Sequence, residues 1–255
     1  MPPLTLAIIE DEEAHFRLMK RAILRDIPGT IIHHFPDAAA CLENLDQTAP
    51  DIVLTDYLMP GMNGIAFLET LKERRIDIPV IMITGQGDEN IAVRAMKLGA
   101  WDYLVKSADF FSMLPSVIEK VARGWRFKES LRESERRFQD LAEWTSEWIW
   151  EIDGEGRVRY SNRIAQEIIG HRAGEVVGKT FYDFFPEDER ARLKEQYLGI
   201  MAARESFSDR EVRLAHRDGH EVQVECSAFP FFSAAGAFLG YRGIHRDITA
   251  RKEAE

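Results

Sequence analysis

Short apolar runs alternate with amphipathic segments through the first half of the chain. Each run is five or six residues long and ends at a polar or turn-forming position, as strands buried in a parallel sheet do. The runs occupy residues 4–9, 30–35, 52–56, 79–83 and 101–105. The segments that follow them repeat apolar residues at helical spacing, at 14–25, 37–45, 63–74, 89–98 and from 110 onward. This alternation predicts an α/β domain: one doubly wound, five-stranded parallel sheet with helices on both faces.

The pattern changes at about Glu143, where apolar and polar residues begin to alternate as in half-buried strands. Two hairpins are predicted, one turning at 154–156 and one at 217–219, and a last strand follows. The predicted strands span 148–153, 157–161, 207–216, 221–229 and 238–248. Helices are predicted at 163–169, capped by Asn162, and at 186–201, while 174–185 is expected to be irregular. This half is therefore an α+β domain with an antiparallel sheet and helices on one side.

A long helix is predicted between the two halves, because residues 110–141 contain few helix breakers. Beyond Trp125 the segment is highly charged, and Leu131 and Phe138 keep a seven-residue spacing. Either the helix pairs with a second copy, or it is a solvated spacer, since Lys128 and Glu135 are polar. We expect a first domain at 1–124, a helical linker at 125–142 and a second domain at 143–255.

Composition narrows the possible functions. A chain of 255 residues that is 45% hydrophobic and 30% charged is expected to fold. Its net charge of −10 argues against nucleic-acid binding. Cys41 and Cys226 are too far apart to indicate a zinc site or a disulfide framework. Because no signal peptide or membrane-length apolar run is present, we expect a cytoplasmic protein without membrane contact.

Polar residues stand at the ends of several predicted strands of the first half. Glu10 and Asp11 follow the first strand, Asp56 ends the central strand, and Thr84 and Lys106 follow the fourth and fifth. Each alone could be an ordinary surface or turn residue. Parallel strands, however, bring their carboxyl ends to one edge of the sheet, which is where open α/β sheets bind ligands. We therefore predict one site there.

The residue types at this edge indicate phosphoryl chemistry. Three crowded carboxylates repel one another and need a cation to stay ionised. Oxygen ligands of this kind suit Mg²⁺, and a carboxylate beside Mg²⁺ can attack a phosphoryl group to form an acyl phosphate. An ammonium group and a hydroxyl, such as those of Lys106 and Thr84, would then neutralise the transferring oxygens.

Residues 4–124 resemble a response-regulator receiver domain of two-component signalling, which has a flavodoxin-like fold. The resemblance rests on four stretches: 8–12 (IIEDE), 54–64 (LTDYLMPGMNG), 81–85 (IMITG) and 98–106 (LGAWDYLVK). It implies that Asp56 accepts a phosphoryl group from a cognate histidine kinase or phosphotransfer protein. Thr84 and Lys106 would hold the phosphoryl group, and Thr84 and Tyr103 would act as the switch.

The resemblance also implies a Mg²⁺ site. Asp11, Asp56 and the carbonyl of Leu58 would bind the ion directly, and Glu10 would act through water. Glu10 stands where the family more often has aspartate. Leu58 and Gln86 take the positions that flank the phosphoryl group, and Leu58 offers no hydrogen bond to a hydrolytic water. We expect the phosphorylated form to be long-lived.

Residues from about 135 to 250 resemble a PAS sensor domain. The matching stretches are 150–153 (WEID), 160–162 (YSN), 168–170 (IIG), 177–179 (VGK) and 240–249 (GYRGIHRDIT). Such domains bind haem, flavin or a small metabolite between sheet and helices, or only dimerise. The ligand here is unknown, but haem and photoactive flavin are not expected. The Asn-Cys-Arg flavin motif is absent, Cys226 lies on a strand, and His171, which with His245 is a possible haem ligand, follows a helix stop. The aromatic residues are expected to be core: Phe181, Tyr182, Phe184, Phe185 and Phe229.

The sequence thus predicts a phosphorelay protein whose receiver signals through a helix to a PAS module, as a homodimer formed by linker and PAS domain. We expect no enzyme activity beyond self-catalysed phosphotransfer and dephosphorylation. One alternative is the N-terminal regulatory part of a longer sensor histidine kinase or nucleotide cyclase. A metal phosphatase is a weaker alternative, because Leu58 stands where that chemistry needs a second aspartate.

Overall fold

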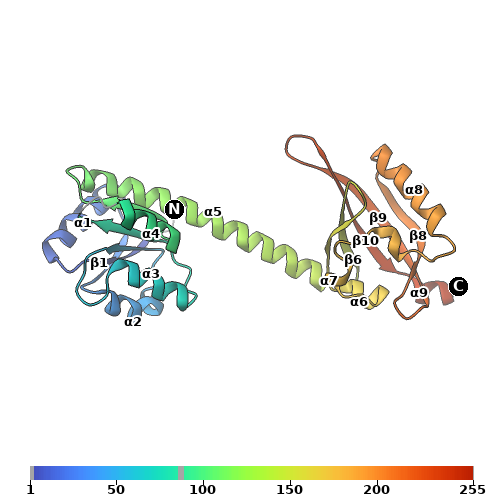
Figure 1. Ribbon diagram of the computed structural model, residues 1–255, viewed down its shortest axis with the longest axis horizontal. Coiled ribbons are helices and arrows are strands. Elements are labelled where there is room, and N and C mark those ends of the chain that lie inside the picture. Colours follow the sequence, from blue (N-terminus) through green and yellow to red (C-terminus); the bar gives the residue numbers. More distant parts are fainter. Residues whose placement is uncertain (1–2, 86–88, 255) are drawn as a thin grey trace. The chain divides into compact units, whose positions relative to one another are not determined.

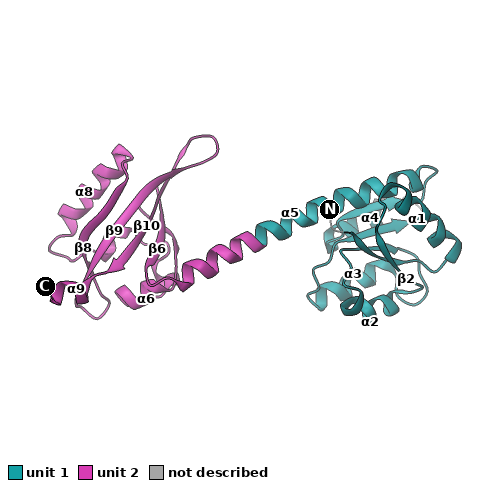
Figure 2. Cartoon of the chain, turned by 180° about the vertical axis from the view of Figure 1, so that it is seen from behind, with its two compact units in different colours: residues 1–132 teal, residues 133–255 magenta. Residues whose placement is uncertain are grey.

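The computed structural model describes residues 3–85 and 89–254. The chain divides into two compact units, residues 1–132 and 133–255 (Figure 2). Helix α5 (Phe110–Trp144) runs from the first unit into the second (Figure 1). Within the described residues, no helix is both long and apolar enough to cross a membrane.

The first unit is the predicted doubly wound α/β domain. Its five strands form a parallel sheet in the order β2-β1-β3-β4-β5. The strands are β1 (Thr5–Ile9), β2 (Ile31–Phe35), β3 (Ile52–Asp56), β4 (Val80–Thr84) and β5 (Asp102–Val105). The helices before α5 are α1 (Glu13–Asp26), α2 (Ala38–Thr48), α3 (Gly64–Glu73) and α4 (Glu89–Leu98).

Alternate side chains of the central strands pack into two separate hydrophobic cores, one on each face of this sheet. Ile52 and Leu54 pack with α1 and α5, where Phe16 and Leu114 lie. Val53 instead packs on the opposite face, with α2 and α3. Because both faces are covered, β3 and β4 are buried along their whole length. This burial fixes the register that delivers Asp56 to the edge of the sheet.

The second unit is the predicted α+β domain, with an antiparallel sheet in the order β7-β6-β10-β9-β8. Its strands are β6 (Trp148–Asp153), β7 (Val158–Ser161), β8 (Phe207–Ala215), β9 (Glu221–Phe232) and β10 (Phe238–Asp247). Its helices are α6 (Ile164–Ile169), α7 (Ala173–Val176), the 3₁₀ helix η1 (Phe181–Phe184), α8 (Arg190–Ala203) and α9 (Thr249–Ala254). One face of the sheet packs against α6, α8 and η1 to form a single core.

Several predicted details of the second unit are wrong. Asn162 does not cap α6; its side chain is fully buried, accepts a hydrogen bond from the Ile149 amide and donates to the Ala142 and Glu147 carbonyls. The segment 174–185 is not irregular, since it contains most of α7 and all of η1. Helix α8 begins at Arg190 rather than at residue 186. Asn162 therefore ties the end of α5 to β6, a non-local role that a cap motif does not reveal.

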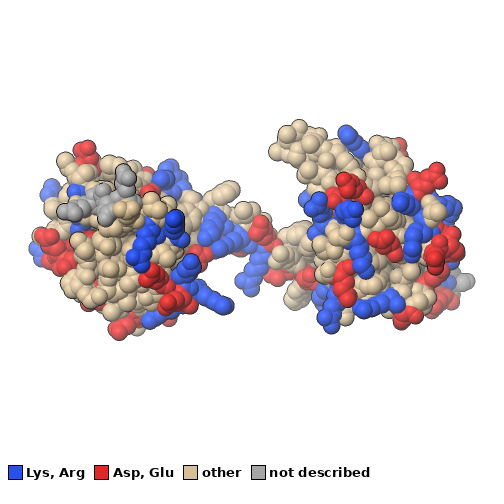
Figure 3. All heavy atoms as spheres, in the orientation of Figure 1, with Lys and Arg blue, Asp and Glu red and all other residues tan. Residues whose placement is uncertain are grey.

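The charged side chains are of mixed sign over the visible surface. On the face in Figure 3, Lys and Arg alternate with Asp and Glu on both units. The end of the β9–β10 hairpin differs, because residues 229–240 contain no charged side chain. Phe229, predicted to be core, lies on this segment and is 54% exposed. It points away from the core because β9 alternates, and Ala228 and Cys226 occupy the inward positions.

Candidate functional site

Asp56 is the last residue of β3, at the carboxyl edge of the first sheet. It is buried, with 7% of its surface exposed. The chain turns immediately after it. The Leu58 amide donates to Asp56 Oδ1 at 3.2 Å, and the Gly64 amide donates to the Tyr57 carbonyl at 3.1 Å. Glycine is needed at 64, because a Cβ there would lie 2.5 Å from Met82 Sδ and 2.8 Å from the Asp56 carbonyl oxygen. The turn thus holds the carboxylate in one position.

Lys106 follows β5 and reaches two carboxylates at this edge. Its Nζ lies 2.5 Å from Asp56 Oδ2 and 2.9 Å from Glu10 Oε2. Its backbone amide donates to the Thr84 carbonyl at 2.7 Å, which fixes where the side chain starts. Burial alone would lower the pKa of Lys106, but the hydrogen bonds with Asp56 and Glu10 outweigh it and raise that pKa. The ammonium group therefore stays charged and bridges both acids.

Glu10 is buried at the end of β1 and is held from three sides. Besides Lys106, His15 Nδ1 lies 2.5 Å from Glu10 Oε2, and His34 Nε2 lies 2.8 Å from the Glu10 carbonyl oxygen. Burial raises the pKa of Glu10, but the hydrogen bonds with Lys106 and His15 prevail, so the pKa lies below its usual value. Glu10 is thus an ionised carboxylate with fixed orientation.

The sequence does not predict that either histidine, His15 or His34, belongs to this site. His15 lies on the first turn of α1 and contacts the rings of Phe110 and Phe111 from α5, with centroids 5.6 and 5.5 Å away. His34 lies on β2 and stacks on Phe16. A signal for His15 existed, because it follows the acidic pair by one helical turn. No local signal identifies His34, which reaches Glu10 from the neighbouring strand.

The other predicted site residues lie around this centre. Asp11 is exposed, and no described residue forms a hydrogen bond or ion pair with its carboxylate. Thr84 is buried at the end of β4. Tyr103 lies partly buried on β5, against the core that α2 and α3 cover. Leu58 exposes 69% of its surface next to Asp56. Gln86 lies outside the described residues.

The residues at this edge fit a hard divalent cation. Glu10, Asp11 and Asp56 bring three carboxylates, and Lys106 is the ammonium group that two of them share. The Asp11 carboxylate thus remains without a partner among the described residues. Oxygen donors from separate loops, with room left for water, are what Mg²⁺ prefers. Asp11, Asp56 and the Leu58 carbonyl could bind the ion directly, and Glu10 could contact it through a water molecule.

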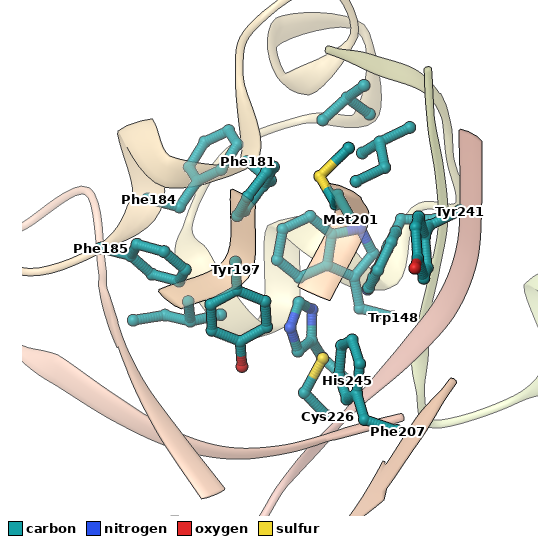
Figure 4. A pocket seen from close by; sticks show the side chains of 14 residues that line it. Trp148, Phe181, Phe184, Phe185, Tyr197, Met201, Phe207, Cys226, Tyr241 and His245 are labelled. Atoms are coloured by element: carbon teal, nitrogen blue, oxygen red, sulfur yellow. The ribbon is translucent and has the colours of Figure 1, made fainter. Parts of the chain in front are cut away.

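A small apolar cavity lies in the core of the second unit. It measures about 40 Å³, and aromatic side chains from the sheet, η1 and α8 surround it (Figure 4). Phe181, Phe184 and Phe185 line it, as do Tyr197 and Cys226. A space of this size can hold a few water molecules. It does not hold a haem or flavin with the side chains as they stand.

His245 on β10 points into this cavity (Figure 4). Its ring lies 4.9 Å from that of Trp148 and 5.4 Å from that of Trp150. Burial lowers the pKa of His245 to about 3, so the imidazole is neutral. His245 Nδ1 and Trp150 Nε1 are buried and have no hydrogen-bond partner among the described residues. By contrast, His171 lies near Phe184 and does not line the cavity.

Comparison with known proteins agrees with this two-part structure. Residues 6–117 match the family model of the response regulator receiver domain, and residues 143–253 match that of the PAS fold. The methanogenesis regulatory protein FilR1 of Methanothrix harundinacea is 35% identical over 123 residues, which cover 47% of this chain and 27% of that protein. The transcriptional regulatory protein FixJ of Bradyrhizobium diazoefficiens is 36% identical over 132 residues, which cover 52% and 62%.

The chain thus spans less than two thirds of the length of these curated relatives. Among solved structures, the PAS domain of a protein from Colwellia psychrerythraea superimposes with a TM-score of 0.42 at 19% identity, covering 46% of this chain and 98% of that chain. By the two family models, the chain combines a response regulator receiver domain with a PAS domain that follows it.

Proposed function

We propose that this protein takes part in a phosphorelay in which Asp56 accepts a phosphoryl group from a cognate histidine kinase or phosphotransfer protein. The observation that carries the proposal is the placement of the Asp56 carboxylate at the sheet edge, paired with Lys106, whose ammonium group also pairs with Glu10. A carboxylate held this way is an oriented nucleophile. Asp11 and Asp56 would bind Mg²⁺ with the Leu58 carbonyl, and Glu10 would act through water.

Phosphoryl transfer would rearrange the contacts of Lys106. One oxygen of Asp56 would form the new bond to phosphorus as the bond between phosphorus and the donor's nitrogen breaks. Lys106 then exchanges its contact with Asp56 for one with a phosphoryl oxygen, while its contact with Glu10 can persist. When bound, Mg²⁺ neutralises charge on the transferring group. Thr84 would donate to the phosphoryl group from the end of β4, and this movement would draw Tyr103 inward.

Phosphorylation would thereby shift an equilibrium that exists before it. The surface that changes would comprise α4, β5 and the start of α5. We propose residues 1–124 as the receiver domain, 125–142 as the linker and 143–255 as the PAS domain. Asp77 binds Lys128 and Arg132 on α5 at 3.2 and 2.5 Å, so the first part of the linker is fastened to the receiver.

We also propose that α5 pairs with the α5 of a second copy. Four large apolar side chains form its exposed stripe: Phe127, Leu131, Phe138 and Leu141. Their spacings of four, seven and three residues place them at the d, a, a and d positions of successive heptads. Lys128 and Glu135, which favoured a solvated spacer, fall outside these positions. A coiled coil tolerates polar residues outside its a and d positions, so Lys128 and Glu135 do not favour the spacer over the paired helix.

For the PAS domain we propose a sensory role through the cavity around His245. A ligand there must be small and must accept a hydrogen bond from Trp150 Nε1, which can only donate. Haem and photoactive flavin are not expected, and the ligand's identity is open.

We propose that the described domains carry no enzyme activity beyond self-catalysed transfer and loss of the phosphoryl group. A metal phosphatase is disfavoured because exposed, apolar Leu58 occupies the place of its second aspartate. A regulatory role at the head of a longer histidine kinase or nucleotide cyclase remains the alternative. A cytoplasmic, two-component role without nucleic-acid or membrane contact fits the net charge of −10.

Intact-mass spectrometry tests the proposal. With acetyl phosphate and Mg²⁺, the wild type should gain ~80 Da, the mass of one phosphoryl group. Asp56→Asn should gain nothing, and Asp51→Asn is the matched control, because Asp51 lies before β3 and bonds the Thr5 amide instead. Equal mass gain in wild type and Asp56→Asn would rule out Asp56 as acceptor.

A further inference from the structure

We propose a second metal site, in the PAS domain, at the turn between β8 and β9. His216, Asp218 and His220 form it, and it would take a borderline divalent transition metal such as Zn²⁺. It is separate from the oxygen-lined site in the receiver and from the cavity around His245. Imidazole nitrogens with one carboxylate are typical Zn²⁺ ligands, and they discriminate against Mg²⁺.

The donor atoms already converge. His216 Nδ1 lies 2.7 Å and His220 Nδ1 2.5 Å from the same atom, Asp218 Oδ1. The three potential ligand atoms all lie within 4.8 Å of one another. Atoms bound about 2 Å from one ion lie at most about 4 Å apart. A small rotation of one imidazole would therefore complete the set.

The backbone of the turn holds this arrangement in place. The His216 amide donates to the His220 carbonyl at 2.8 Å, and the Gly219 amide donates to the His216 carbonyl at 3.0 Å. Gly219 has a φ of +98°, a conformation that glycine adopts freely. The two imidazoles stack with centroids 4.2 Å apart. His216 also packs on Gly170, where a Cβ would lie 2.7 Å from its Nε2.

The charges around the turn favour a cation. Asp218 is exposed, and its carboxylate brings a negative charge to the turn. Arg217, which lies between His216 and Asp218 in the sequence, pairs with Glu175, with Nη1 3.3 Å from Oε1. Arg213 is likewise paired, with Glu189 and Glu221. The neighbouring cations are thus occupied by other acids and do not compete for Asp218.

A bound ion would link this turn to the sensory cavity through the strands it joins. Leu214 of β8 lies two residues before His216 and lines the cavity, and Cys226 of β9 lines it as well. Clamping the strand ends would reduce their motion relative to each other. The open coordination positions would be filled by water, because only three protein ligands are present.

Equilibrium dialysis of the full chain against Zn²⁺ in excess Mg²⁺ tests this site, since Mg²⁺ occupies the receiver. The wild type should bind one Zn²⁺ that His220→Gln and Asp218→Asn each weaken by about tenfold or more. Asp218→Asn keeps the turn's side-chain hydrogen bonding but loses the charge. His33→Gln, on β2 of the receiver, is the control and should bind Zn²⁺ as the wild type does.

Two further readouts separate a metal site from a merely structural turn. Co²⁺ should give d–d absorption bands that Asp218→Asn abolishes, and Zn²⁺ should slow hydrogen exchange in β8 and β9 of the wild type only. Equal Zn²⁺ binding in wild type, His220→Gln and Asp218→Asn would overturn the proposal. So would the absence of any Zn²⁺ binding in excess Mg²⁺ by a folded wild type.

Discussion

The two domains bury polar groups in opposite ways. In the receiver, Lys106 forms ion pairs with both Glu10 and Asp56 at distances of 2.5–2.9 Å. In the PAS domain, His245 Nδ1 and Trp150 Nε1 are buried without a partner. A satisfied ionic cluster is stable until an ion or phosphoryl group offers better contacts. An unsatisfied pair instead favours any small ligand that brings the missing hydrogen bond. The difference fits the proposed functions, a reaction site in the receiver and a ligand-binding site in the PAS domain.

The largest effect is expected from breaking the sheet that carries the PAS cavity. Gly240→Ala should destabilise the PAS domain by more than about 4 kcal/mol. Its φ is +148°, and a Cβ there would lie 1.8 Å from the Ile152 carbonyl oxygen. Hydrogen exchange should show a loss of protection in β6 and β10, with β3 and β4 of the receiver unchanged. Gly199→Ala is the control, since a Cβ at 199 meets nothing within 4 Å. Equal protection in both variants would contradict this explanation.

Removing the cation of the receiver cluster should have the next largest effect. Lys106→Met leaves Glu10 and Asp56 buried as two unneutralised carboxylates, at a cost of about 3 kcal/mol. Urea unfolding at neutral pH measures this, and Mg²⁺ should recover part of the lost stability. Lys120→Met is the matched control, because Lys120 pairs with Asp102 on the surface. If both variants lose equal stability, the cluster is not the ionic centre described.

Lowering the pH should destabilise the PAS domain before it destabilises the receiver domain. The pKa of Glu10 in the folded state lies below its ordinary value of 4.5, so its stabilising contribution is intact from pH 7 to 5 and is lost only below pH 4.5. His245 behaves oppositely. Its pKa of about 3 lies below the unfolded value of 6.5, so the unfolded state takes up the proton first and stability falls from pH 6.5 downward.

The slope for His245 is at most about 1.4 kcal/mol per pH unit. Hydrogen exchange at pH 7 and 5, corrected for intrinsic rates, should show β9 losing stability while β4 keeps it. His245→Phe should flatten the PAS response. His171, whose pKa is also lowered by burial, contributes in the same direction, so His171→Gln should reduce the slope only in part. An unchanged slope in His245→Phe would exclude His245 as its source.

The smallest effect concerns the lifetime of the phosphoryl group. Leu58 is exposed beside Asp56 and offers no hydrogen bond to water. Leu58→Gln should speed loss of the phosphoryl group by about tenfold, less than the roughly 10²-fold or more of a general base, because an amide can orient the water but cannot take its proton. Phos-tag gels after removal of acetyl phosphate measure the half-life, with Leu18→Gln on α1 as control. A wild-type half-life of seconds would contradict the expected long-lived form.

The sequence allows much of the receiver to be predicted, because its site lies at strand ends. Five apolar runs place Glu10, Asp56, Thr84 and Lys106 at one edge, and the sheet order confirms that arrangement. The contact of His34 with Glu10 could not be predicted, since it crosses from a neighbouring strand. For the same reason the sequence does not predict that His245 points inward, and the prediction that Phe229 belongs to the core is wrong. Local patterns indicate elements, while cavities depend on the register between strands.

The most direct test is to identify the phosphorylated atom. Borohydride reduces an acyl phosphate on aspartate to homoserine, so the modified residue can be read by peptide mass spectrometry. After treatment with acetyl phosphate and Mg²⁺, homoserine should appear at position 56 and should be absent from 11 and 51. Conversion at Asp11 instead, or no conversion in a protein that binds Mg²⁺, would contradict the assignment of Asp56 as the phosphoacceptor.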